Sequence, residues 1–161
     1  MKYEMRLSGS GGQGLVLAGR ILAEAAALYD ELNATQSQSY GPEARGGASR
    51  SDVIISDQDI EFPKTGKLDL LLAFTKDAAD SYVEDLAEGG MLIIDEDVVT
   101  EPPAGDFRLV KVPFQRLGRE KFDRPVVANI IACGVIACLC GHISTEGVRA
   151  ATLSRVPRGT E

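Results

Sequence analysis

The amino-acid sequence predicts an α/β fold in which a mostly parallel β-sheet carries helices on both faces. Two observations lead to this prediction. Short apolar runs of strand length alternate along the chain with longer stretches of helical period. The first strand is also followed by a glycine loop and then directly by a helix, which is the order of a βαβ unit. Because 161 residues suffice for one sizeable core, we expect a single domain over residues 1–161.

The first βα unit is the most informative part of the sequence. Residues 3–7 alternate like a strand, and residues 8–14 form a glycine-rich loop in which Gly9, Gly11 and Gly14 fit the G-x-G-x-x-G pattern of Rossmann-like folds. Glycines let backbone N–H groups approach an anion, and the start of a helix adds unpaired N–H groups and a positive dipole end. The loop therefore predicts a phosphate-bearing ligand, and a tight turn that binds nothing stays open as the alternative.

Two nucleotide chemistries are disfavoured by the residues around this loop. Leu15 and Val16 stand where a P-loop needs Lys and Ser or Thr, so ATP hydrolysis is not expected. An NAD site needs an acidic residue at the end of the second strand. The candidate strand, residues 33–39, contains no acid, so ordinary NAD binding is not expected either.

The remaining elements follow from apolar spacing and capping residues. Residues 15–29 carry one apolar stripe at helical spacing, and further strands are predicted at residues 51–56, 68–74, 91–94 and 107–112. A helix is expected over residues 76–86, with Thr75 as its N-cap and Gly89–Gly90 at its end. Residues 113–124 read as polar and irregular, but their basic residues have roughly helical spacing, which fits a solvated helical face or a cluster facing an anionic ligand or partner. Two last helices are predicted at 126–140, almost wholly apolar, and 144–155.

A second functional segment is predicted where residues 36–50 form a polar stretch without any period. Loops of this length inside a compact domain are usually functional or disordered. Tyr40, Gly46 and Gly47 belong to this predicted recognition loop, and Arg45 is suited to hold a phosphate or a carboxylate. The alternative is that Glu43 and Arg45 pair with each other. If the strands are placed correctly, this loop and the glycine loop lie at the same edge of the sheet.

Composition excludes several classes of protein. The net charge of −7 disfavours a nucleic-acid binder, which needs a basic face. The N-terminus lacks the apolar core of a signal peptide, and the longest apolar stretch, residues 130–140, is too short to span a bilayer. The odd number of cysteines fits a reducing compartment, so we expect no membrane association and a cytoplasmic location.

No catalytic or metal-binding set is recognisable in the sequence. Cys133, Cys138 and Cys140 have no metal-site spacing, and small buried residues are the better interpretation. His142 is the only histidine and is expected near a helix end, which leaves little material for general base catalysis. We therefore expect no catalytic residue and no metal ligand in this chain, and a domain that works as part of something larger.

Two motifs together resemble a known family. Gly-Ser-Gly-Gly-Gln-Gly at residues 9–14 and Gln-Ser-Tyr-Gly-Pro-Glu-Ala-Arg-Gly-Gly at residues 38–47 closely resemble the gamma subunit of 2-oxoacid:ferredoxin oxidoreductases. Asn129, at the head of the apolar helix, also fits. The resemblance runs from the first strand to about Gly141 and is nearest to the 2-oxoglutarate enzyme, although the pyruvate and branched-chain versions share the motifs.

The resemblance implies a function that the residues alone do not. Such complexes oxidatively decarboxylate a 2-oxoacid on thiamine diphosphate, transfer the acyl group to coenzyme A and pass electrons through iron–sulfur clusters to ferredoxin. Thiamine diphosphate and the clusters are expected in partner alpha, beta and sometimes delta subunits, and no cofactor is expected to be covalently bound here. The gamma subunit is expected to contact coenzyme A through the two motifs, that is through Gly9, Gly11, Gly12, Gln13, Gly14, Tyr40, Arg45, Gly46 and Gly47.

The resemblance also sets expectations for the isolated chain. It should be inactive alone and expose apolar surface that favours a homodimer. Family members usually carry a further C-terminal segment, so the C-terminus is expected to be shortened. The competing hypothesis is a stand-alone nucleotide- or flavin-binding module, which would bind its ligand as a stable monomer.

Overall fold

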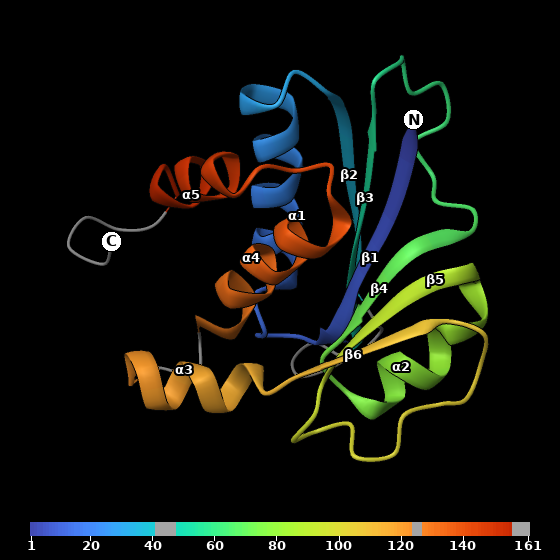
Figure 1. Ribbon diagram of the computed structural model, residues 1–161, viewed down its shortest axis with the longest axis vertical. Coiled ribbons are helices and arrows are strands. Elements are labelled where there is room, and N and C mark those ends of the chain that lie inside the picture. The colour runs from blue at the N-terminus through green and yellow to red at the C-terminus, as the bar shows by residue number, and fades with distance from the viewer. Residues whose placement is uncertain (41–47, 124–126, 156–161) are drawn as a thin grey trace.

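The computed structural model describes residues 1–40, 48–123 and 127–155. In these residues six strands form one sheet in the order β2-β3-β1-β4-β5-β6 (Figure 1). The strands are β1 (Lys2–Ser10), β2 (Asn33–Tyr40), β3 (Ala48–Ser56), β4 (Leu68–Ala73), β5 (Leu86–Asp95) and β6 (Arg108–Val112). Three neighbouring pairs are parallel, and β3 is antiparallel to both β1 and β2. The α/β prediction is confirmed, and the sheet is mixed because of β3.

The polar stretch predicted as a loop over residues 36–50 forms strand at both of its described ends. β2 ends at Tyr40, which confirms the candidate strand over residues 33–39, and β3 begins at Ala48, so the loop prediction was wrong for residues 36–40 and 48–50. The physical reason is that β2 is an edge strand whose polar side chains stay hydrated or bond across the pair. The Gln36 Nε2 atom donates to Ser51 Oγ at 2.8 Å, for example.

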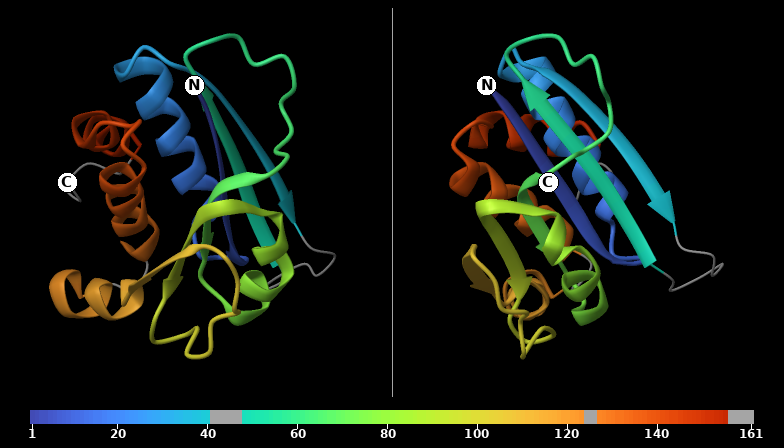
Figure 2. Two further views of the ribbon diagram at one scale, coloured as in Figure 1. Left: turned by 45° about the vertical axis from the view of Figure 1, so that its right-hand side comes forward. Right: turned by 90° about the vertical axis from the view of Figure 1, so that its right-hand side faces the viewer.

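Three helices cover one face of the sheet and one helix covers the other (Figures 1 and 2). The first face carries α1 (Leu15–Glu24) with its π-helical continuation η1 (Ala25–Tyr29), α4 (Ala128–Cys140) and α5 (Thr145–Leu153). These helices bury the apolar side of β1, including Met5 and Leu7. Gly19 lets α1 approach β3 closely, because a Cβ there would lie 2.1 Å from Ser51 Oγ.

The opposite face is covered by α2 (Lys76–Tyr82) and the single turn η2 (Val83–Asp85). Thr75 is the N-cap as predicted, since its side chain accepts a hydrogen bond from the Ala78 backbone N–H at 3.1 Å. The predicted end of this helix was wrong: Gly89 and Gly90 lie within β5, which begins at the buried Leu86. Burial of Leu86 against the second hydrophobic cluster outweighs the helical spacing of the sequence.

The C-terminal third begins with α3 (Phe114–Phe122), in a segment that read as irregular but whose basic residues had roughly helical spacing. The helix is anchored by Phe114, whose ring lies 5.3 Å from that of Phe74 in a tilted arrangement. α4 and α5 follow as predicted, with Ser144 as the N-cap of α5. No helix in the described part of the chain has the length and hydropathy needed to cross a membrane.

Candidate functional site

The strand register brings the two predicted motifs to the same edge of the sheet. Ser49 of β3 pairs with Gly9 of β1 on one side and with Tyr40 of β2 on the other. The C-terminal ends of β1 and β2 therefore lie at the same edge of the sheet, on either side of β3, as the sequence predicted. Arg45, Gly46 and Gly47 lie outside the described residues.

The glycine loop needs its glycines for two structural reasons. Gly12 and Gly14 have φ values of +86° and +74°, a region that other residues rarely adopt. At Gly9, a Cβ would lie 2.2 Å from the Gln13 Oε1 atom. That oxygen accepts a hydrogen bond from the Ser10 backbone N–H at 2.8 Å, so Gln13 folds back and closes the loop on itself.

The last loop glycine is held by a residue from the other end of the chain. Asn129, which is 5% exposed at the start of α4, donates from Nδ2 to the Gly14 backbone oxygen at 3.1 Å. A Cβ on Gly14 would lie 2.3 Å from the same Nδ2 atom. Gly14 is the N-cap of α1 and makes no side-chain capping bond. The first-turn N–H groups of α1 and its dipole therefore give this edge a weakly positive character.

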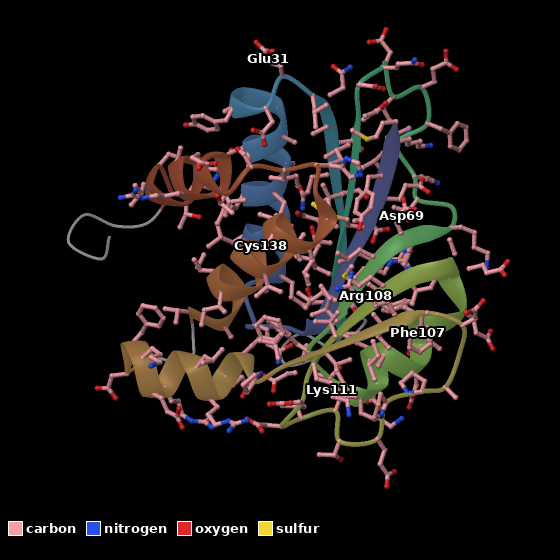
Figure 3. All side chains as sticks on the ribbon, in the orientation of Figure 1. Glu31, Asp69, Phe107, Arg108, Lys111 and Cys138 are labelled. Carbon is pink, nitrogen blue, oxygen red and sulfur yellow. The ribbon has the colours of Figure 1, made fainter. Side chains whose placement is uncertain are left out.

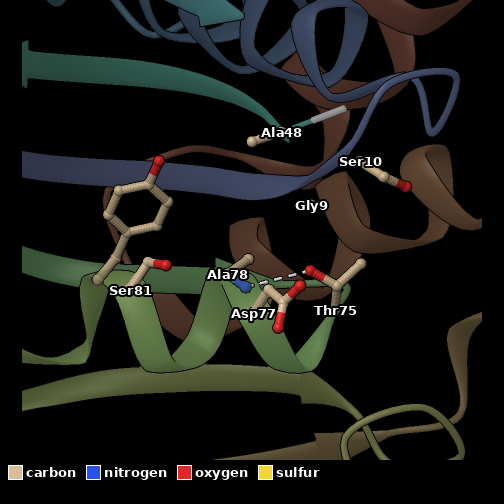
Figure 4. A pocket seen from close by; sticks show the side chains of 8 residues that line it. Gly9, Ser10, Ala48, Thr75, Asp77, Ala78 and Ser81 are labelled. Carbon is tan, nitrogen blue, oxygen red and sulfur yellow. Dashed lines mark hydrogen bonds between the residues drawn. The ribbon is translucent and has the colours of Figure 1, made fainter. Parts of the chain in front are cut away.

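A pocket of about 150 Å³ opens at this edge, on the side of the sheet that faces α2 (Figure 4). Gly9 and Ser10 line it, together with Ala48, Thr75, Asp77, Ala78, Ser81 and Tyr82. Gly11, Gly12, Gln13 and Gly14 are not among the lining residues, because the loop turns toward α1 on the other face. The predicted site residues therefore divide between the two faces of the sheet edge.

A buried ion network around Arg6 contacts Tyr82, one of the residues that line the pocket. Arg6 is 4% exposed and donates from Nε to Asp52 Oδ1 at 2.8 Å and from Nη1 to Asp85 Oδ2 at 2.6 Å. Thr65 completes the network by bonding both Arg6 and Asp52. Burial alone would lower the pKa of the Arg6 guanidinium, but its hydrogen bonds to Asp52 and Asp85 raise the pKa above the usual value.

The same network positions the aromatic wall of the pocket. The Arg6 guanidinium lies 4.8 Å from the centre of the Tyr82 ring, and Arg50 lies 5.5 Å from it. This network was not predicted from the sequence. Its signal was present, since Arg6 lies between the buried apolar residues Met5 and Leu7. A charge in such a place requires a partner.

The surroundings of the cysteines and of His142 point to packing roles. Cys133 and Cys140 are buried as predicted, and burial raises the pKa of the Cys133 thiol to about 12. Cys138 is exposed, so the prediction of burial was wrong there, because it lies on the outer side of α4. His142 follows the C-cap Gly141 and packs its ring 5.0 Å from Tyr3. Within residues 1–40, 48–123 and 127–155, no three His, Cys, Asp or Glu side chains form a group suited to a metal.

Comparison with known proteins decides the family. Residues 4–161 match the family described as pyruvate ferredoxin/flavodoxin oxidoreductase. The chain belongs to this family. It is 50% identical over 163 residues to the 2-oxoglutarate synthase subunit KorC of Methanocaldococcus jannaschii, covering 100% of this chain and 87% of the relative.

Solved structures agree with the sequence match. The gamma subunit of the keto/oxoacid ferredoxin oxidoreductase from Geobacter sulfurreducens matches with a TM-score of 0.90 and 48% identity, over 98% of this chain and 87% of that one. The 2-oxoglutarate:ferredoxin oxidoreductase from Magnetococcus marinus, solved with 2-oxoglutarate, coenzyme A and succinyl-CoA, shares the fold. Its TM-score is 0.85 at 18% identity, over 96% of this chain and 27% of that one. The gamma-subunit resemblance is confirmed: the chain is a subunit of a 2-oxoacid:ferredoxin oxidoreductase.

Proposed function

We propose that this gamma subunit serves a complex that oxidises 2-oxoglutarate. The observation that supports this substrate is the 50% identity to KorC along the whole chain. The subunit acts as a single domain in a cytoplasmic hetero-oligomer with alpha and beta, and in some arrangements delta, subunits. Thiamine diphosphate and the iron–sulfur clusters belong to those partners, and ferredoxin receives electrons from them.

The role of this chain is to bind and orient coenzyme A. The contact is made by the sheet edge where the two motifs emerge, through Gly9, Gly11, Gly12, Gln13, Gly14, Tyr40, Arg45, Gly46 and Gly47. Support comes from the register that joins the motifs and from the uncapped start of α1, whose N–H groups suit the phosphates of coenzyme A. A structural relative that carries this fold was solved with coenzyme A bound.

Co-purification tests the complex and its substrate together. The tagged chain is expressed with its partner subunits and the eluate is assayed for coenzyme A-dependent dye reduction with 2-oxoglutarate, pyruvate and branched-chain 2-oxoacids. Larger subunits that co-elute with activity on 2-oxoglutarate are the expected result. A chain that elutes alone, inactive but holding a nucleotide or flavin, would favour the stand-alone binding module.

A matched pair of glycine variants tests the coenzyme A contact. Gly12 and Gly89 both have positive φ and open space within 4 Å of the place where a Cβ would lie, but only Gly12 belongs to the glycine loop. Asparagine tolerates this backbone region, so both variants should fold. Gly12→Asn is expected to raise the KM for coenzyme A roughly tenfold, equivalent to about 1.4 kcal/mol, without changing the KM for 2-oxoglutarate. Gly89→Asn should change neither, and equal effects from both would contradict the contact.

A further inference from the structure

The pocket beside α2, called the α2 pocket below, lies where the connections of the sheet reverse direction. β1 and β4 are parallel neighbours in the middle of the sheet. After β1 the chain passes through α1 to β2 at one edge, whereas after β4 it passes through α2 to β5 on the other side (Figure 1). Gly9 and Ser10 from the end of β1 and Thr75 after β4 line the pocket. Open α/β sheets bind their ligands at such a reversal, outside the carboxyl ends of the strands.

The charge in the α2 pocket does not suit a phosphate group. None of its lining residues is a lysine or an arginine, and Asp77 contributes an exposed carboxylate that forms no ion pair with any described residue. The adjacent Lys76 is paired with Asp80 at 2.7 Å. Arg108 and Lys111, labelled in Figure 3, belong to the outermost strand β6 and do not line the pocket. A phosphate would be repelled by this carboxylate, whereas a hydrogen-bond donor would find an acceptor in it.

The other lining residues make the α2 pocket small, with apolar walls and a few polar groups. Figure 4 shows Ala48 and Ala78 on opposite sides of it. Ser81 adds an exposed hydroxyl group, and the Tyr82 ring is held by the Arg6 guanidinium at 4.8 Å. The volume is about 150 Å³, whereas pockets that enclose a whole drug-sized ligand measure roughly 300–1,000 Å³. The α2 pocket therefore suits a single uncharged ring system with a hydrogen-bond donor.

One part of coenzyme A has these properties. The thiol end must reach the thiamine diphosphate of the partner subunits, so the nucleotide end is the one that this chain holds. Within that end, the phosphates suit the N–H groups at the uncapped start of α1, on the other side of the sheet edge. The adenine ring is flat and uncharged, and its 6-amino group donates hydrogen bonds. The base and the phosphates thus match the two sides of the edge separately.

We propose that the α2 pocket binds the adenine ring of coenzyme A and that Asp77 selects this base by accepting a hydrogen bond from its 6-amino group. The inference rests on the proposed function, since it requires that coenzyme A binds at this edge. It adds a residue outside both glycine-containing motifs to the predicted contact. A base without the amino group would leave the Asp77 carboxylate without this donor, and such a loss is the usual source of discrimination by a polar group.

A coenzyme A analogue with unsubstituted purine in place of adenine tests the selection by Asp77. The purified complex is assayed with 2-oxoglutarate, and the KM for the analogue is divided by the KM for coenzyme A. The native complex should give a ratio of about ten, because the analogue lacks the amino donor. Asp77→Ala should bring the ratio to about one, mainly by raising the KM for coenzyme A. Asp77→Asn keeps an acceptor oxygen and should retain part of the selectivity.

The matched control removes a carboxylate from the same helix. Asp80 is exposed on α2 and does not line the pocket, so Asp80→Ala should keep the native ratio. The ratio separates a hydrogen bond from a general effect of charge, because lost repulsion of the phosphates would change both KM values equally. A native ratio near one, or a native ratio retained in Asp77→Ala, would overturn the role of Asp77.

A second variant fills the α2 pocket without touching its carboxylate. Ser81 is exposed, so Ser81→Leu should fold and should raise the KM for coenzyme A at least roughly tenfold, with the KM for 2-oxoglutarate unchanged. Asp80→Leu places the same side chain outside the pocket and should leave both KM values unchanged.

The glycine-loop variant separates failure of this inference from failure of the proposed function. If Ser81→Leu behaves like Asp80→Leu while Gly12→Asn still raises the KM for coenzyme A, the α2 pocket is overturned and the coenzyme A contact stands. If neither Ser81→Leu nor Gly12→Asn changes that KM, both are overturned.

Discussion

The side-chain amide of Asn129 and the backbone oxygen of Gly14 are joined by a hydrogen bond of 3.1 Å across 115 residues of sequence. This bond fixes the glycine loop at the start of α1 to the start of α4. The same amide occupies the space that a side chain on Gly14 would need. The glycine loop and the start of α4 are therefore energetically linked through this bond.

A double-mutant cycle measures this coupling. Gly14→Ala forces a Cβ onto a φ of +74° and to within 2.3 Å of Asn129 Nδ2, so we expect a loss of roughly 2–3 kcal/mol in the free energy of unfolding. Asn129→Gly removes the amide and should cost about 1–2 kcal/mol. Because the second change also removes the clash, the double variant should lose less than the sum. Urea unfolding followed by circular dichroism gives all three values, and additive losses would show that the residues are not coupled.

The buried Arg6–Asp52 pair predicts a large effect of removing one charge. Asp52 is 7% exposed, so Arg6→Met leaves a buried carboxylate without its main partner. We expect a loss of roughly 3–5 kcal/mol in the free energy of unfolding. Arg6→Met combined with Asp52→Leu should recover much of that loss, because the buried charge is then gone as well. Both are measured by urea unfolding.

An exposed arginine of the same chain supplies the comparison. Arg116 bonds Glu96 and Asp97 at the surface, and Arg116→Met should hardly change the unfolding midpoint, since exposed ion pairs contribute little. If Arg6→Met lowered the free energy of unfolding as little as Arg116→Met does, the buried network around Arg6 would not be important for stability.

Short-range patterns in the sequence predicted much of the fold. The stripe of residues 15–29, the N-cap Thr75, the last helix over residues 144–155 and the apolar strands were read from local features, and the structure has helices and strands at these places. The same holds for the two motifs, whose common edge follows from β1 and β2 pointing the same way on either side of β3.

The misplaced elements depended on contacts that no local pattern contains. Gly89 and Gly90 read as the end of a helix, whereas burial of Leu86 starts a strand before them. Residues 36–39 belonged both to the candidate strand and to the predicted loop because their side chains are polar, and pairing with β3 is what makes them a strand. The roles of Arg6 and Asn129 likewise depend on partners that lie far from them in the sequence.

Backbone strain at Glu31 predicts a stabilising substitution. Glu31 links η1 to β2 with a φ of +57°, a left-handed conformation that costs an ordinary residue roughly 1 kcal/mol. Glu31→Gly should raise the free energy of unfolding by up to about 1 kcal/mol. Glu31→Ala removes the same charge and keeps the strain, so it is the matched control and should give no gain. Equal effects from the two variants in thermal unfolding would assign the gain to the lost charge.

Asp95 is fully buried at the end of β5. Its Oδ2 atom accepts a hydrogen bond from the Gln115 backbone N–H at 3.1 Å, and its Oδ1 atom accepts one from the Asp97 N–H at 3.1 Å. The N-cap position of α3 is Pro113, which makes no side-chain capping bond. Asp95, at the end of β5, supplies the missing cap instead.

Asp95→Ala should therefore cost roughly 2–3 kcal/mol, because two backbone donors lose their acceptor in a buried place. Asp95→Asn keeps the shape but turns an NH₂ group toward one of the two N–H donors, so we expect a loss close to that of alanine. Urea unfolding gives the free energies, and amide hydrogen exchange at Gln115 should accelerate in both variants. An asparagine variant as stable as the native chain would mean that shape, and not the pair of acceptor oxygens, is what α3 requires at this position.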